Sequence, residues 1–171
     1  MNALTPLPYV TERLKGGAIV QYGELPIGET EEGVVIEPEV EIQVADRADQ
    51  ISGAAGVYVI KGGFQIRLTL TRFTAECYAA ALGLSADISA SPAVVQFSWP
   101  AVLPQSPLRI VGQRADGIPA IWYFPAVSVL PSGSVTLGRE PSDVPMVLKA
   151  LVDPADVSSF GQLEIGEAPV A

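Results

Sequence analysis

The fold class is decided by one stretch of eleven residues, Val34-Val35-Ile36-Glu37-Pro38-Glu39-Val40-Glu41-Ile42-Gln43-Val44. Its even positions are apolar throughout, and its odd positions after Val35 carry a carboxylate or an amide. Alternation over this length is typical of a β-strand with one face buried and the other in water. Pro38 cannot donate to a strand ladder, which predicts a free edge or a local break at that residue.

The flanking sequence supplies partners for this strand. A second alternating stretch at 64–71 has apolar residues at 64, 66, 68 and 70, and we predict that it pairs with the first in one sheet. This pairing brings Arg67 close to the glutamates. Upstream we expect a short strand at 17–22 and a solvated loop at 23–33. The connection at 46–63 is predicted to be a long loop with a strand fragment at 57–60.

One helix is predicted, at about residues 74–82. Thr74 is a suitable N-cap, Glu76 lies in the first turn where the helix dipole favours a carboxylate, and Gly83 can end the helix in left-handed geometry. An apolar stripe at helical spacing runs through Phe73, Cys77, Ala80 or Ala81, and Leu84. In such a stripe Cys77 is expected to be a small buried hydrophobe and not a nucleophile.

The rest of the chain has β character, and the dipeptide Asp116-Gly117 predicts a tight hairpin turn. Further strands are expected at 94–99, 108–113, 120–129, 134–138, 144–152 and 161–165. The fold class is therefore mainly β, a β-sandwich or partly closed barrel with one flanking α-helix. We divide the chain into an N-terminal arm at 1–16, a domain at 17–165 and a C-terminal tail at 166–171.

Composition restricts the chemistry. The 171 residues include no histidine and a single cysteine, so a histidine base, a disulfide within the chain and a zinc cage are all missing. No motif for a phosphate loop, a serine nucleophile or a calcium loop is found. We predict that the protein is not an enzyme and that it binds neither a metal nor a cofactor. No membrane-spanning run and no signal peptide are seen, so we expect a protein without a membrane partner that is not exported by the usual route.

Charge is concentrated in one part of the chain. The formal net charge is −9, and the segment from Glu24 to Asp49 holds nine acidic side chains and one basic, so it carries −8 of this total. An acidic balance argues against binding nucleic acid. The mean hydropathy of +0.34 is high for so acidic a protein. Two interpretations remain open: an Ala- and Val-rich globule, or a surface covered by further copies of the chain.

The order of these elements resembles the major tail tube protein of long-tailed bacteriophages. The likeness covers roughly residues 17 to 165, and it rests on the alternating strand, the long loop, the second strand with its helix, an aromatic strand and a late strand. These are the segments 32–46, 63–70, 74–83, 121–125, 144–153 and 160–161. The N-terminal arm and the Pro-rich link at 100–107 have no counterpart in it.

The resemblance implies a structural virion protein whose hexameric rings stack into a tube that conducts phage DNA. It implies a negative lumen, which we assign to Glu37, Glu39 and Glu41. It also implies that the arm and the loop at 46–63 bind neighbouring subunits and rings, through Asp46, Arg47, Asp49, Tyr58 and Lys61. Its partners would be copies of itself and the tape-measure, tail-terminator and baseplate or tip proteins. Double-stranded DNA would pass through without specific binding.

Other functions fit the same residues. A β-sandwich binding or adhesion module would fold alone, bind its ligand through loops and stay monomeric. A tail terminator or a secretion-tube subunit would form rings but differ in whether those rings stack without limit. The row of glutamates also has a simpler interpretation, as the solvent-exposed face of a strand with no specific role.

Overall fold

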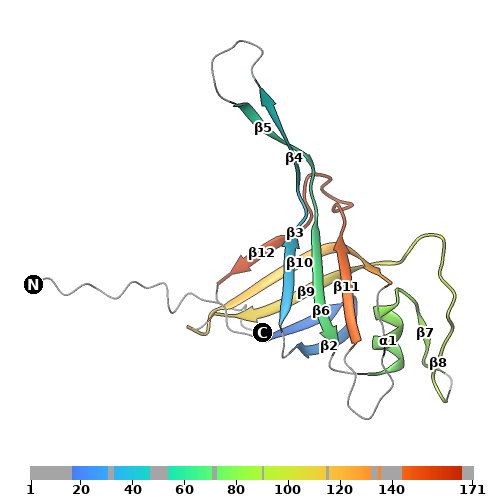
Figure 1. Cartoon of the computed structure of the whole chain (residues 1–171). Helices are drawn as coiled ribbons and strands as arrows, with labels where there is room; N and C mark the ends of the chain where they lie inside the picture. The colour runs from blue at the N-terminus through green and yellow to red at the C-terminus, as the bar shows by residue number, and fades with distance from the viewer. Residues whose placement is uncertain are drawn as a thin grey trace, which may run out of the picture.

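The computed structural model describes residues 17–30, 33–46, 54–70, 73–89, 91–114, 116–131, 135 and 144–166 (Figure 1). The described chain is mainly β with one short helix, which confirms the predicted fold class. The N-terminal arm, most of the predicted strand at 134–138 and all of the tail after Gly166 lie outside the described residues.

One large antiparallel sheet forms the body, in the order β2-β1-β9-β10-β11-β6-β3, with β12 beside β10. Its eight strands are β1 (Ala18–Tyr22), β2 (Leu25–Thr30), β3 (Val34–Pro38), β6 (Phe64–Leu70), β9 (Gln105–Gln113), β10 (Pro119–Leu130), β11 (Val144–Ala150) and β12 (Gln162–Ile165).

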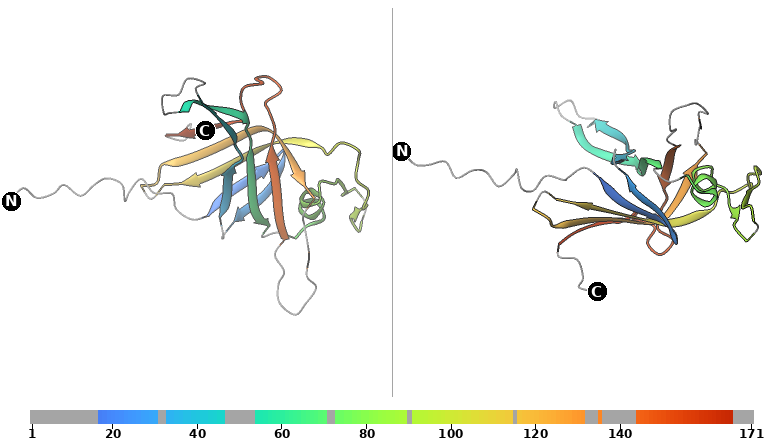
Figure 2. Two further views of the ribbon diagram at one scale, coloured as in Figure 1. Left: turned by 45° about the horizontal axis from the view of Figure 1, so that its top comes forward. Right: turned by 90° about the horizontal axis from the view of Figure 1, so that it is seen from below.

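The sheet becomes two layers because β10 belongs to both. The first half of β10 pairs with β12, its second half pairs with β11, and β9 runs along its other edge. The β9–β10 register shifts between Phe124 and Val127, where Pro125 lacks the N–H that a continuous ladder needs. Figure 2 shows the two layers facing each other. At the open side of the sandwich, the edge strand β2 of one layer contacts β6 of the other.

The core lies between these layers. Inward positions of β6 and β11 meet inward positions of β1 and β9, and Ile66, Met146, Leu148, Val20 and Leu108 are fully buried there. The predicted inward residues of the second alternating strand are therefore correct: Ile66, Leu68 and Leu70 are buried, and Phe64 packs at the margin.

The solvated loop expected at 23–33 is largely a strand. After a turn at Gly23, which has φ +59°, β2 runs back along β1 and buries Ile27 and Thr30. Pro26, Gly28 and Glu29 hide this strand in the sequence, because residues of these types are typical of turns and loops.

The deciding stretch forms two strands and not one. β3 is an edge strand that pairs with β6 alone within the described sheet and ends at Pro38, which confirms both consequences predicted for that proline. After Glu39 and Val40 the chain continues as β4 (Glu41–Asp46), which pairs with β5 (Ala54–Lys61) in a separate ribbon. The predicted loop at 46–63 thus contains a full strand. Val40 and Ile42, expected to face inward, are exposed because the ribbon projects away from the body (Figure 1).

The helix α1 (Ala75–Ala81) is close to the predicted range. The Thr74 hydroxyl accepts from the Cys77 N–H at 3.2 Å, and Gly83 has φ +67° just after the helix. Cys77, Ala80 and Ala81 are buried against β10, β11 and β2, whereas Phe73 of the predicted stripe is exposed. The Trp99 indole N–H donates to the Leu82 carbonyl at 2.9 Å and ties the next segment to the helix end.

That segment, 84–104, contains little regular structure. β7 (Ala86–Asp87) and β8 (Val94–Val95) pair briefly, and the predicted strand at 94–99 is reduced to its first two residues. Prolines at 92, 100 and 104 prevent a longer ladder.

Burial of Cys77 yields a first prediction. Its side chain is 2 % exposed, so a thiol reagent should label the native protein at least ~100-fold more slowly than the unfolded chain, since reaction requires local opening. Cys77→Ala should fold and assemble, at a stability cost of about 1 kcal/mol. Labelling kinetics with and without denaturant measure the first effect, and urea titration measures the second. Rapid native labelling with loss of assembly would return Cys77 to the candidate nucleophiles.

Candidate assembly surfaces

The predicted glutamate row follows the outer side of β3 and continues into the ribbon. Glu37 lies in β3, Glu39 lies in the link that follows, and Glu41 begins β4. Val34 and Ile36 pack against the core, so the alternate residues Val35 and Glu37 face outward.

Each glutamate has a cationic neighbour. The Arg67 guanidinium lies 3.0 Å from a carboxylate oxygen of Glu37, and the Lys149 ammonium lies 2.9 Å from one of Glu39. Glu41 stands opposite Lys61 in the β4–β5 register.

Strand register explains these pairs. Glu37 is opposite Gln65 on β6, which is opposite Lys149 on β11, and Arg67 follows two residues after Gln65 on the same outward face. Arg67 also donates to the Gln65 amide oxygen at 2.7 and 3.2 Å, which holds the guanidinium beside Glu37. The predicted approach of Arg67 to the row is confirmed. Lys149 was missed, because nothing near it in sequence shows that β11 pairs with β6.

The three glutamates and their three cationic neighbours have no net charge together. The surface therefore carries less net negative charge than the negative lumen that the resemblance implies. Its carboxylates pair with cations that would otherwise attract phosphate. The side chains of the Glu37–Arg67 and Glu39–Lys149 pairs are between 38 % and 54 % exposed, so these ion pairs add little to stability.

The β4–β5 ribbon carries large apolar side chains with no cover in the described structure. Ile42 stands opposite Val59, Tyr58 stands opposite Gln43, and these apolar residues together with Ile60 are each more than half exposed. Two-stranded ribbons are marginal by themselves in water. Such a ribbon is therefore suited to contact another surface.

The predicted contact residues are only partly described. Asp46 ends β4, and the exposed Tyr58 and Lys61 lie on β5, so these three belong to the ribbon. Arg47 and Asp49 lie outside the described residues.

A second apolar surface was not predicted. The outward residues of the neighbouring strands β1, β9 and β10 form two rows in register, which we call the β9 face: Ile19–Val111–Ile121 and Gln21–Arg109–Tyr123. Ile19 is 60 % exposed, and no ion pair or side-chain hydrogen bond of Arg109 is found within the described residues. Alternation in β1 and β9 does indicate this face, but the sequence does not say which strands are neighbours.

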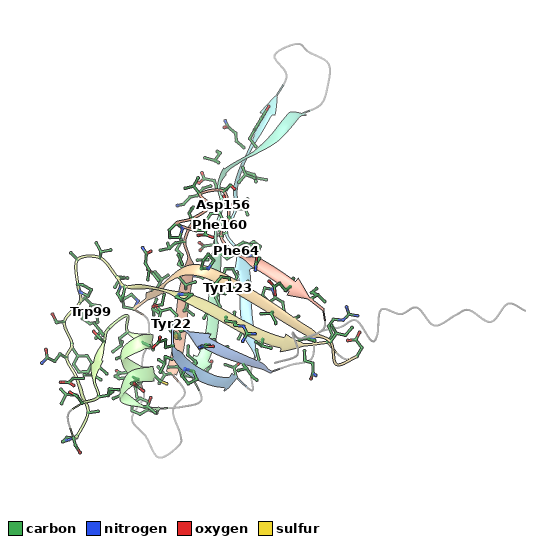
Figure 3. All side chains as sticks on the ribbon, turned by 180° about the vertical axis from the view of Figure 1, so that it is seen from behind. Tyr22, Phe64, Trp99, Tyr123, Asp156 and Phe160 are labelled. Carbon is green, nitrogen blue, oxygen red and sulfur yellow. The ribbon has the colours of Figure 1, made fainter. Side chains whose placement is uncertain are left out.

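A third surface lies beside the helix. Phe73, Tyr78 and Phe97 form an aromatic ladder, with ring centroids 5.2 Å apart for the first pair and 6.5 Å for the second. Phe73 and Phe97 are 66 % and 65 % exposed. In Figure 3 Trp99, two residues beyond Phe97, lies well away from Tyr123 of the β9 face. The ladder and the β9 face are therefore separate patches.

An open groove of about 1480 Å³ separates α1 from the β1–β2 turn and the segment 94–106. Among the described residues, its lining includes the carboxylates of Glu24, Glu76 and Asp87 and no lysine or arginine. Tyr22 lies at its inner end and donates its phenol proton to the Val127 carbonyl at 3.4 Å. Burial raises the pKa of this phenol above its ordinary value of 10.0, and a hydrogen bond with Ser106 partly opposes that rise.

Tyr22 should make the protein sensitive to alkaline pH. Because the folded state holds the phenol proton more tightly than the unfolded state, this stabilisation is fully present below the unfolded pKa and is lost as pH rises through the folded pKa. Urea midpoints measured between about pH 9 and pH 11 should fall in the wild type and fall less steeply in Tyr22→Phe. Equal slopes for the two proteins would contradict this assignment.

The described residues contain no group of three or more histidine, cysteine, aspartate or glutamate side chains placed to hold a metal ion. Across those same residues, no helix has the length and apolar character needed to cross a membrane. Comparison of the chain with known protein families finds no match, and comparison with curated proteins finds none either.

Proposed function

We propose that this chain is a structural subunit of a phage tail tube, in which hexameric rings stack to form a channel for DNA. The tube belongs to the virion, and tape-measure, tail-terminator and baseplate or tip proteins are its further partners. The hexamer and these partners come from the resemblance to major tail tube proteins, and the assembly surfaces come from the residues described above.

The observation that carries the proposal is the projecting β4–β5 ribbon. Its apolar residues Ile42, Tyr58 and Val59 are exposed on a ribbon that extends beyond the body, where no described residue covers them. A ribbon of this kind fits a contact with a different surface on another copy, and such a heterologous contact extends without closing. In the proposed tube the ribbon joins one ring to the next.

The glutamate row takes the lumen side in this proposal. Glu37 and Glu39 neutralise Arg67 and Lys149 across the outer side of β3, β6 and β11, and Glu41 faces Lys61 at the root of the ribbon. DNA in transit would then meet carboxylates at each cation that could hold a phosphate.

Negative-stain microscopy of the purified full chain at high concentration tests the proposal, and microscopy of virions that contain it is the stricter test because tubes can require a nucleus. We expect hollow rings and tubes. The double variant Tyr58→Ser/Val59→Ser should keep its thermal midpoint within a few degrees but lose long tubes. Val157→Ser, which alters a residue 84 % exposed outside the ribbon, should leave tubes intact.

Three results separate the alternatives. A monomer at every concentration and salt, together with virions whose tubes lack the chain, would overturn the proposal in favour of a binding or adhesion module. Single rings that never stack would indicate a tail terminator. Tubes from the ribbon variant as long as those of the wild type would remove the ribbon from the ring-to-ring contact.

A further inference from the structure

We propose that the aromatic ladder of one copy packs onto the β9 face of the next copy, with Arg109 as the charged anchor of the contact. The inference rests on the proposed function, because it names the contact between neighbours within a ring. It concerns surfaces separate from the ribbon and from the glutamate row.

The β9 face has the composition of an interface. The outward face of a solvated antiparallel sheet is normally polar, whereas here Ile19, Val111 and Ile121 form an aliphatic row across three strands. The adjacent row adds one phenol and one guanidinium, from Tyr123 and Arg109. Glu164 of β12 stands opposite Ile121 at the margin of this stripe. The single cation of the stripe, Arg109, has no ion pair within the described residues, so the stripe is suited to a partner that is apolar and offers negative charge or π-electrons.

The ladder side offers that chemistry. Residues 73–108 contain two acidic side chains, Glu76 and Asp87, and no lysine or arginine, and Arg72, which precedes Phe73, lies outside the described residues. The exposed rings of Phe73 and Phe97 present faces on which a guanidinium stacks favourably. The aromatic rings and acidic side chains of the ladder side are therefore complementary to the guanidinium and apolar row of the β9 face. These features indicate that the partner of the β9 face is the aromatic ladder of a second copy of this chain.

Two different patches on one chain make the contact heterologous. Each copy contacts one neighbour through its aromatic ladder and the other neighbour through its β9 face. The same contact repeated around an axis closes a ring when a whole number of copies completes 360°. The ribbon then remains available for the axial contact.

Cysteine cross-linking of assembled material tests the contact. In a Cys77→Ala background, Phe97→Cys supplies a thiol on the ladder and Tyr123→Cys supplies one on the β9 face. A short bismaleimide should join these thiols between chains and give a series of bands on a denaturing gel, the largest of which contains six copies. Either cysteine alone should give at most traces, and the pair Phe97→Cys/Val157→Cys is the matched control. Adding Arg109→Glu to the productive pair should reduce cross-linking at least tenfold, and Arg109→Lys should reduce it less.

Each outcome bears on a stated claim. If rings or tubes form but the cysteines at 97 and 123 are not cross-linked, this contact is wrong and the proposed function still stands. Strong cross-linking by Phe97→Cys alone indicates a symmetric contact between two ladders and also overturns it. A folded Cys77→Ala protein and a folded wild type that both stay monomeric in every condition, together with virions whose tubes lack the chain, overturn the proposed function and this contact with it.

Discussion

Replacing Glu37, Glu39 and Glu41 together by glutamine should leave the fold and the tube unchanged but make the tube retain duplex DNA. The substitution removes three carboxylates and exposes Arg67, Lys149 and Lys61, each of which now has an acidic neighbour. The net charge of this six-residue surface changes from zero to +3 in every subunit. A hexameric ring would then offer 18 uncompensated cations, on the order of one for each phosphate in its stretch of DNA.

The size of the effect follows from counterion release. If each subunit gains about three phosphate contacts, the logarithm of the binding constant should fall with the logarithm of salt concentration at a slope of roughly −2.7. We expect at least ~10-fold tighter retention at low salt, measured as DNA held by purified tubes and as slower ejection from virions. The fold should survive, because exposed ion pairs contribute only about 0–1 kcal/mol each.

A matched triple variant separates position from net charge. Glu24, Asp156 and Glu164 are exposed and lie outside the row, and changing them to Gln, Asn and Gln removes the same total charge. This control should leave DNA passage unaffected. Equal retention by both variants would show that overall charge matters and that the row does not line the channel.

Local patterns predicted those elements whose signals are complete within a few residues. The helix was found from Thr74, Glu76 and Gly83, which cap or begin it directly. Strands β6, β10 and β11 were found from alternation or apolar runs. The break at Pro38 was found because a missing N–H acts at its own position.

The remaining features depend on which strands become neighbours. Lys149 reaches Glu39 only because β11 pairs with β6, and Arg109 joins Ile19 on one face only because β9 pairs with β1. Val40 and Ile42 alternate as a buried face would, yet they are exposed because the ribbon leaves the body after Pro38. Sequence alternation gives the two faces of a strand but does not say what covers either face.

Gly161→Ala should be the most destabilising small substitution in the described chain. Gly161 precedes β12 with φ +155°, and an added Cβ would lie 2.5 Å from the Tyr123 carbonyl oxygen and 2.8 Å from Cδ1 of Phe124. The Tyr123 oxygen belongs to the backbone of the strand that both layers share, so neither it nor the glycine can move without disturbing the β10–β12 pairing from Tyr123↔Gln162 onward. We expect a cost of about 3 kcal/mol or more.

A loss of that size should lower the thermal midpoint by about 6–12 °C for a protein of this length. Gly166→Ala is the matched control, because Gly166 ends the same segment and an added Cβ there meets nothing within 4 Å. The control should stay within about 0.5 kcal/mol of the wild type. Calorimetry or urea titration of the three proteins measures both values. If Gly161→Ala were as stable as Gly166→Ala, β12 would not be held against β10 at the close approach described here, and the first half of β10 would be a free edge.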